Sequence, residues 1–136
     1  ILLVEDNPDD VELTKLALKN ETIDCNLVVM SDGVEVIDHF SSTNNQIDEI
    51  PDIILLDLKM AKMGGLETLK HLRRHDKTKL IPVAILTSSD EETDIIESYN
   101  LGANSYIRKP VDFDEFRETI RILGKYWLKL NESIIN

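Results

Sequence analysis

Cysteine and basic residues are scarce in this chain of 136 residues. The single cysteine, Cys25, excludes an internal disulfide and suits a reducing compartment, so we expect a cytoplasmic protein. The chain has only 15 basic residues and 26 acidic ones, which gives a formal net charge of -11. Nucleic-acid phosphates and anionic membrane surfaces are bound through basic patches, so the charge balance argues against both kinds of partner.

Long hydrophobic runs are missing as well. No apolar stretch is long enough to cross a bilayer, and no signal peptide is visible. Because the chain opens inside the apolar run Ile1–Val4, we expect further residues ahead of it. Hydrophobic residues still make up 42% of the chain, which is enough for one core. The length then predicts a single domain covering residues 1–136, with no internal repeat or linker.

The apolar residues fall into short runs that alternate with helical patterns. Strands are predicted at residues 1–4, 25–30, 53–57, 82–86 and 105–109. Helices are predicted at residues 8–20, with Asn7 as the cap, and at 34–40, 66–72, 90–102 and 113–131. A polar loop is predicted at 41–49, and Lys70, Arg73 and Arg74 are predicted to form a solvated helix face. The alternation of five strands with five helices predicts an α/β fold, a doubly wound parallel sheet with right-handed crossovers.

Polar residues follow the predicted strands where each one ends. Asp57 closes the apolar run of the third strand, and Glu5 and Asp6 follow the first. Chemistry in open α/β sheets lies beyond the carboxyl ends of the strands. If the first and third strands are neighbours, three carboxylates crowd one pocket, and their repulsion raises the pKa of at least one unless a cation is present. Thr87 and Lys109 end the fourth and fifth strands.

This set of residues resembles the receiver domain of two-component response regulators, the CheY-like superfamily. The resemblance covers essentially the whole chain. It rests on the order and spacing of the acidic pair after the first strand, Asp57 with Gly65 eight residues on, Thr87, and Lys109-Pro110. It implies a flavodoxin-like sheet of five strands in the order 2-1-3-4-5.

The resemblance implies a phosphoacceptor and a magnesium site. Asp57 resembles the aspartate that accepts the phosphoryl group. Asp6 would bind Mg²⁺ directly together with Asp57, Glu5 would act through a coordinated water, and Lys59 would offer its backbone carbonyl. A hard divalent cation with oxygen ligands neutralises the repulsion between an ionised aspartate and an anionic phosphoryl donor.

Further roles also follow from the resemblance. Thr87 would donate its hydroxyl to one phosphoryl oxygen, and Lys109 would pair with another. The peptide bond between Lys109 and Pro110 is expected to be cis. Tyr106 resembles the aromatic switch residue, whose ring would fill the space that Thr87 leaves when it moves toward the phosphoryl group.

Two positions depart from the family pattern. The acidic pair is Glu5-Asp6, where two aspartates are commoner, and Ala61 stands where proline is usual. The first change lengthens one arm of the metal site and should be tolerated, because that residue acts through water. The second loosens the loop after Asp57 and affects its rigidity more than its chemistry.

Two other classes of function stay open. A metal-dependent aspartyl phosphatase or phosphotransferase also uses an aspartate nucleophile, but such enzymes usually carry a second aspartate where this chain has Lys59, and no cap domain is visible. A degenerate receiver that only acts as a scaffold would not need the complete set of acids, threonine and lysine. We expect a signalling module that assists its own phosphotransfer and dephosphorylation and is otherwise not an enzyme.

The expected partners follow from the same resemblance. A sensor histidine kinase would supply the phosphoryl group. The tail Tyr126-Trp127-Leu128 is similar to small single-domain regulators that partner bacterial phytochromes, so the kinase is expected to be phytochrome-like. No output domain follows, so we expect output through contact with a downstream protein or through a phosphorelay.

The final helix carries an apolar stripe at alternating spacings of three and four residues, which is typical of a packed helix face. Its members are Phe113, Phe116, Ile120, Leu123, Trp127, Leu130 and Ile134. Because a helix over 113–131 is longer than the sheet is wide, we expect it to overrun the sheet and expose Trp127 and Leu130. Exposed groups of this kind mark interfaces, so we expect a homodimer through this helix.

Overall fold

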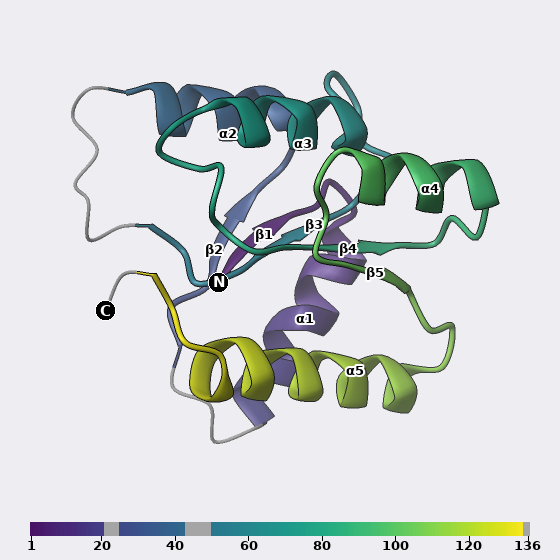
Figure 1. The fold of residues 1–136 in the computed structure, drawn as a ribbon. Coiled ribbons are helices and arrows are strands. Elements are labelled where there is room, and N and C mark those ends of the chain that lie inside the picture. The colour runs from purple at the N-terminus through teal and green to yellow at the C-terminus, as the bar shows by residue number, and fades with distance from the viewer. Residues whose placement is uncertain (21–24, 43–49, 135–136) are drawn as a thin grey trace.

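Short parallel strands form the centre of the computed structural model, which describes residues 1–20, 25–42 and 50–134 (Figure 1). The strand bounds are Leu2–Val4 for β1, Val28–Met30 for β2, Ile54–Leu56 for β3, Val83–Thr87 for β4 and Ser105–Arg108 for β5. The strands form one sheet in the order β2-β1-β3-β4-β5, and every neighbouring pair is parallel. The predicted fold class and strand order are therefore confirmed.

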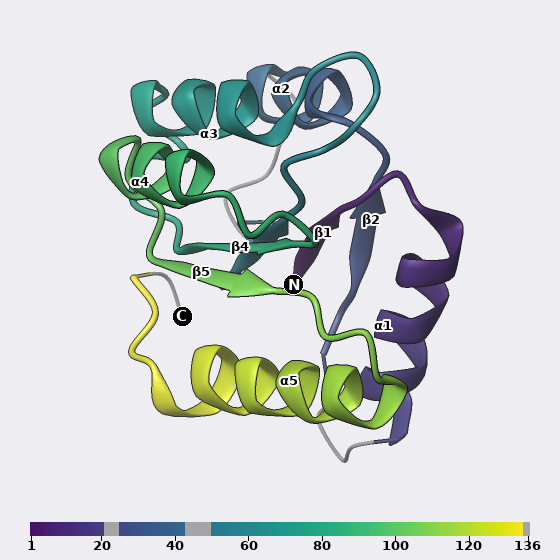
Figure 2. The same cartoon turned by 90° about the vertical axis from the view of Figure 1, so that its right-hand side faces the viewer.

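Helices cover both faces of the sheet (Figures 1 and 2). Their bounds are Pro8–Asn20 for α1, Gly33–Ser41 for α2, Gly65–Arg74 for α3, Glu92–Asn100 for α4 and Phe113–Lys125 for α5. Helices α1 and α5 lie on one face, and α2, α3 and α4 lie on the other. Within the described ranges, none of the helices is both long enough and apolar enough to span a membrane.

The central strand β3 is apolar throughout because it supplies a core on each face. Leu55 belongs to the core under α1 and α5, whereas Ile54 and Leu56 belong to the core under α2 and α3. Successive side chains of a strand point to opposite faces, so a sheet covered on both sides needs apolar residues at consecutive positions. This arrangement holds the carboxyl end of β3, and the residue that follows it, in a fixed place.

Some element boundaries differ from those predicted. Strand β2 lies at the edge of the described sheet and begins at Val28, because its neighbour β1 offers three residues for pairing. Cys25 precedes the strand and packs, half-buried, against the core under α1 and α5. The predicted stop of α4 at Gly102 is confirmed by its left-handed φ of 103°. Most of the predicted loop at 41–49 lies outside the described residues.

The last helix changes geometry before it ends. Residues Tyr126–Leu130 form a π-helical turn, η2, directly after α5. Trp127 is half-buried against the core under α1 and α5, so the expectation that it is presented to solvent is wrong. Leu128, in the same π turn, packs on the same core. Leu130 is 66% exposed, as expected.

The prediction that Arg73 lies on a solvated helix face is wrong. Its guanidinium donates to the backbone carbonyls of Lys79 and Ile81, to the carbonyl of Gly102 and to Oδ1 of Asn104. Arginine presents several donors in a rigid fork and can therefore serve several acceptors at once. This side chain joins the end of α3 to the segments before β4 and β5.

Candidate functional site

Three carboxylates meet just beyond the carboxyl ends of β1 and β3. Val4 pairs with Leu56 in the parallel ladder, so the residues that follow them, Glu5 and Asp57, leave the same edge of the sheet side by side. One carboxylate oxygen from each of Glu5, Asp6 and Asp57 lies within 4.8 Å of the others. In the described parts of the chain, no other group of three or more acidic, histidine or cysteine side chains is close enough to share a metal ion.

The burial of this cluster indicates a need for positive charge. Glu5 is 4% exposed and Asp57 is 6% exposed, whereas Asp6 lies at the surface. A buried carboxylate is costly unless it is paired or coordinates a metal. The cluster offers only oxygen donors, which is the set that hard divalent cations prefer. Its donor chemistry therefore fits a divalent cation, although the protein also supplies a cation of its own.

That cation is Lys109, which follows β5. Its ammonium donates to a carboxylate oxygen of Glu5 and, at 2.7 Å, to Oδ2 of Asp10 in the first turn of α1. The Lys109 ammonium lies 3.7 Å from Oδ2 of Asp57. The backbone N–H of Lys109 donates to the carbonyl of Thr87 at 2.7 Å. Lysine, threonine and carboxylates thus come together from the carboxyl ends of β1, β3, β4 and β5.

Burial and neighbouring charge shift two pKa values at this site. Burial raises the pKa of Glu5 from 4.5 to about 7, and the nearby Asp57 carboxylate adds to the rise while Lys109 opposes it. Burial alone would lower the pKa of Lys109, but its hydrogen bonds to Asp10 and Glu5 and the charge of Asp57 hold that pKa above its ordinary value. Desolvation is thus a larger cause than the carboxylate repulsion expected from the sequence.

Thr87 and Tyr106 meet through Ser89. The Thr87 hydroxyl oxygen accepts a hydrogen bond from the Ser89 backbone N–H at 3.4 Å. The Tyr106 hydroxyl donates to the Ser89 carbonyl oxygen at 2.9 Å, and the Ser89 hydroxyl donates to Asp94 at the start of α4 at 2.6 Å. The two predicted switch residues therefore both contact the same short segment between β4 and α4.

The loop after β3 lies against the acidic cluster. The Lys59 backbone N–H lies 3.5 Å from Oδ1 of Asp57, and the Ala61 backbone N–H donates to Oδ2 of Asp6 at 3.0 Å. A proline at position 61 would have no N–H to donate. Gly65 is required where the loop ends, because a Cβ there would lie 2.2 Å from the Asp57 carbonyl oxygen. The proposed metal contact through the Lys59 carbonyl stays a prediction.

The expectation of a cis bond between Lys109 and Pro110 is wrong. The described residues contain no cis peptide bond. The trans form is intrinsically favoured even before proline. With the trans bond, the Lys109 side chain already reaches Glu5 and Asp10.

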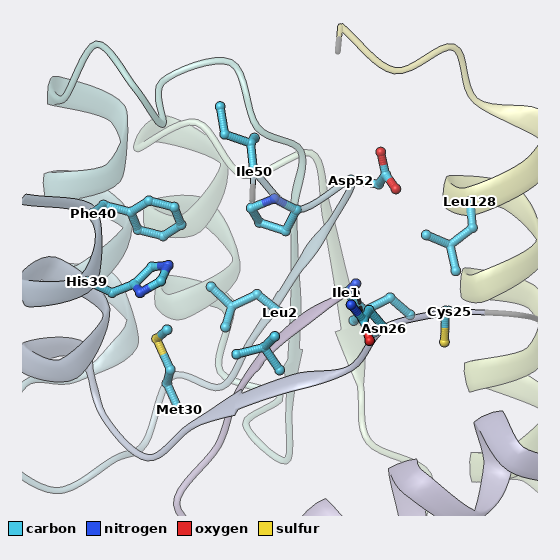
Figure 3. Close-up of a pocket in the computed structure, with 12 residues that line it drawn as sticks. Ile1, Leu2, Cys25, Asn26, Met30, His39, Phe40, Ile50, Asp52 and Leu128 are labelled. Carbon is cyan, nitrogen blue, oxygen red and sulfur yellow. Dashed lines mark hydrogen bonds between the residues drawn. The ribbon is translucent and has the colours of Figure 1, made fainter. Parts of the chain in front are cut away.

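A cavity of about 550 Å³ lies at the opposite edge of the sheet (Figure 3). Ile1, Asn26 and Asp52 line it near the amino ends of β1, β2 and β3, together with Phe40 of α2 and Leu128 of η2. None of the three clustered carboxylates lines this cavity. The charged cluster and the cavity are therefore separate features of the fold.

The sequence matches the family description "Response regulator receiver domain" over residues 1–121. The chain belongs to this family. It is similar to response regulator Rcp1 of Synechocystis sp., with 34% identity over 130 residues that cover 95% of this chain and 88% of that protein. Proteins of this family are signalling proteins of two-component systems, and this match does not favour the alternatives of an aspartyl phosphatase or a degenerate scaffold.

Solved receiver structures agree with the fold. The Mn²⁺-bound form of Rcp1 superposes with a TM-score of 0.86 at 32% identity and covers 97% of this chain and 96% of that one. The phosphorylated cyanobacterial phytochrome response regulator RcpA superposes with a TM-score of 0.89 at 33% identity, covering 98% and 96%. The bacteriophytochrome response regulator AtBRR is 45% identical with a TM-score of 0.72, covering 96% of each chain. The receiver is therefore related to the type that partners phytochromes.

Sequence reasoning missed two contributors to this receiver site. Neither Asp10 nor Ser89 is among the residues that the sequence predicts for the site. A usable signal for Asp10 was its place in the first turn of α1, because that turn follows the carboxyl end of β1 directly. No sequence signal identifies Ser89, since its contacts depend on how the loop before α4 folds.

Proposed function

We propose that this receiver accepts a phosphoryl group on Asp57 from the phosphohistidine of a sensor histidine kinase, with Mg²⁺ as the required cation. The observation that carries the proposal is the cluster of Glu5, Asp6 and Asp57 with the Lys109 ammonium beside it. The cluster offers a nucleophile, oxygen ligands for a cation and a second positive charge within one pocket.

The transfer can be written from the residues of this chain. A carboxylate oxygen of Asp57 attacks phosphorus and forms an O–P bond, while the P–N bond to the kinase histidine breaks and the imidazole leaves with the electron pair. Glu5, Asp6, Asp57 and the Lys59 carbonyl would hold the ion, which supplies charge neutralisation when bound. Lys109, already 3.7 Å from Asp57, is available for a phosphoryl oxygen. The same residues would assist hydrolysis of the phosphoaspartate.

Thr87 and Tyr106 are proposed to convert this charge change into a conformational one. The Thr87 hydroxyl is buried and accepts a hydrogen bond from the nearby Ser89 N–H. A phosphoryl oxygen on Asp57 would draw that hydroxyl away, which would release Ser89 and alter the contact that Tyr106 makes with the Ser89 carbonyl. A beryllofluoride adduct in which Thr87, Ser89 and Tyr106 keep their present positions would count against this switch.

The proposed partners come from the relatives. RcpA and AtBRR are described as phytochrome response regulators, which supports a phytochrome-like histidine kinase as the phosphoryl donor. We propose that residues 1–136 act as one receiver domain in the cytoplasm, where it would contact a downstream protein or pass the phosphoryl group on.

A homodimer through the last helix is part of the proposal. Leu130 and Ile134 are 66% and 61% exposed, and Tyr126 and Ile122 are also exposed on α5 and η2. Apolar groups gathered on one segment are typical of interfaces. Because Trp127 is half-buried against the core and Leu130 is 66% exposed, Leu130 is the better residue with which to test the dimer.

The direct test of the proposed function is phosphorylation in vitro. Purified protein is incubated with phosphoramidate and Mg²⁺, and its intact mass and the modified residue are determined by mass spectrometry. We expect one added phosphoryl group on Asp57 in the wild type and none in Asp57→Asn or in EDTA. Phosphate on a histidine or serine, with Asp57 unmodified, would overturn the assignment.

A further inference from the structure

Asp10 contacts the site from outside the set of residues that the family pattern supplies. It lies in the first turn of α1, and its Oδ2 is 2.7 Å from the ammonium of Lys109, the residue that follows β5. Its side chain is 25% exposed, and that of Lys109 is 11% exposed. A charge-assisted hydrogen bond of this length between partly buried groups is one of the stronger polar contacts in a protein.

The Lys109 ammonium has three N–H donors to distribute. It donates to Glu5 and to Asp10, whereas the 3.7 Å separation from Asp57 is too long for a hydrogen bond. Glu5 belongs to the cluster that would hold a cation, and Asp10 does not. Once a cation occupies the cluster, Glu5 is shared with it, and Asp10 remains the partner that belongs to Lys109 alone.

The charge of Asp10 should have opposite effects on the binding of a metal cation and on the attachment of a phosphoryl group to Asp57. Its negative charge offsets that of Lys109, so it reduces the repulsion between Lys109 and a metal cation. It also reduces the attraction between Lys109 and a phosphoryl group on Asp57. Both effects are transmitted over a few ångströms in a poorly solvated site, where screening by water is weak.

We propose that Asp10 is a positioning residue that shares the Lys109 ammonium with the phosphoryl group, and thereby favours the bound cation while restraining phosphorylation of Asp57. This inference rests on the proposed function, since it concerns the same phosphoryl transfer. Asp10 acts through Lys109 and does not itself touch the nucleophile.

The test variant is Asp10→Asn, which keeps an acceptor oxygen of the same size and removes the charge. We expect a Mg²⁺ affinity about two- to fivefold weaker by titration calorimetry, and a rate of phosphorylation by phosphoramidate at saturating Mg²⁺ about three- to tenfold faster by intact mass. In that reaction the Asp57 oxygen bonds to phosphorus, the P–N bond breaks and ammonia leaves. A merely structural role would weaken both measurements together.

The neighbouring residue provides a matched control. Asp9→Asn removes the same charge from the same turn of α1, but Asp9 is exposed and lies outside the Lys109 contacts. It should change both measurements by less than about twofold, because an exposed charge is screened. Asp10→Glu keeps the charge and should stay closer to the wild type than Asp10→Asn in both measurements.

The outcomes separate the inference from the function on which it rests. Opposite changes in Asp10→Asn, with Asp9→Asn near the wild type, support it. No change, changes in the same direction, or an equal effect in Asp9→Asn would overturn it. If Asp10→Asn shows no cooperative thermal melting, Asp10→Ala is judged by the same pair of measurements. A wild type that takes no phosphate on Asp57 overturns the proposed function itself, and the wild-type reaction alone reveals that.

Discussion

The two edges of the sheet differ in how they use burial. At the carboxyl edge, Glu5 and Asp57 are buried together with Lys109, and their charges depend on one another. At the amino edge, the side chains around the cavity are mostly apolar, and Leu130 nearby is exposed. The same strands run into both edges, so the difference comes from the residues that follow or precede each strand.

This difference indicates which edge is built for function. Charges held together out of water destabilise the fold unless they are neutralised, and proteins keep such arrangements where binding or chemistry requires them. An apolar surface has no such cost, and it can serve packing or assembly. If this is so, the buried charges at the carboxyl edge should reduce the stability of the fold, and the amino edge should be able to carry an interface.

The largest effect is expected from removing the Lys109 charge. Lys109→Met should lower the free energy of unfolding by about 3 kcal/mol at pH 8 without metal, because it leaves buried carboxylates without their partner. Urea denaturation in EDTA measures this. Lys62→Met is the control: it breaks a 3.9 Å pair with Asp32 in which the Lys62 side chain is 73% exposed, and it should cost less than about 1 kcal/mol. Equal costs for the two variants would contradict the contrast between buried and exposed charge.

The next effect is a pH dependence caused by Glu5. Its pKa is raised to about 7 from an ordinary 4.5, so between these values the folded protein binds more protons than the unfolded one. The stability contributed by Glu5 is therefore full below about pH 4.5 and is lost as the pH rises through about 7. In EDTA, the wild type should lose stability from pH 5 to pH 8 more steeply than Glu5→Gln. Parallel curves for the two proteins would refute this account.

Much of the fold could be predicted because it depends on patterns that are local in the sequence. Ile53–Leu56 must be a buried strand, and a residue after it, such as Asp57, must reach the carboxyl edge. The site could be predicted to the extent that strand order brings Glu5 and Asp6 beside Asp57. The partners of Lys109 beyond that set could not be predicted, since its contact with Asp10 depends on how α1 is placed.

Other errors have the same physical origin. Arg73 lies in a pattern typical of a solvated helix face, yet carbonyls from distant loops converge on it. Trp127 lies in the part of the last helix that is expected to overrun the sheet, yet it packs half-buried against the core under α1 and α5. In both cases, contacts with segments distant in the sequence determine the environment of a residue that the sequence predicts to be exposed.

A smaller effect is expected at the exposed end of the last helix. If the proposed homodimer forms through Leu130, then Leu130→Glu should weaken dimerisation about tenfold or more, because a charge would replace an apolar contact. Sedimentation equilibrium with and without beryllofluoride measures it. Lys129→Glu, at an adjacent exposed polar position, is the control for charge alone. A wild type that stays monomeric at high concentration in both conditions would remove the dimer from the proposal.

The smallest effect is expected in the loop after β3, where Ala61 donates its backbone N–H to Asp6 at 3.0 Å. Ala61→Pro removes this donor and restricts the loop. We expect the Mg²⁺ affinity to rise about two- to threefold for two reasons. The Asp6 carboxylate no longer has to give up a hydrogen bond when it binds the ion, and the stiffer loop loses less conformational freedom on binding. Titration calorimetry measures the affinity, and metal-free melting checks that the loop accepts proline.

Ala61→Gly separates these two causes. Glycine keeps the N–H and gives the loop more freedom, so its Mg²⁺ affinity should equal or fall below that of the wild type. If Ala61→Pro instead binds Mg²⁺ more weakly while its metal-free melting is unchanged, the Ala61 amide holds the Asp6 carboxylate in place for the ion. The alanine at this position would then support the carboxyl edge, and the loop would belong to the metal site itself.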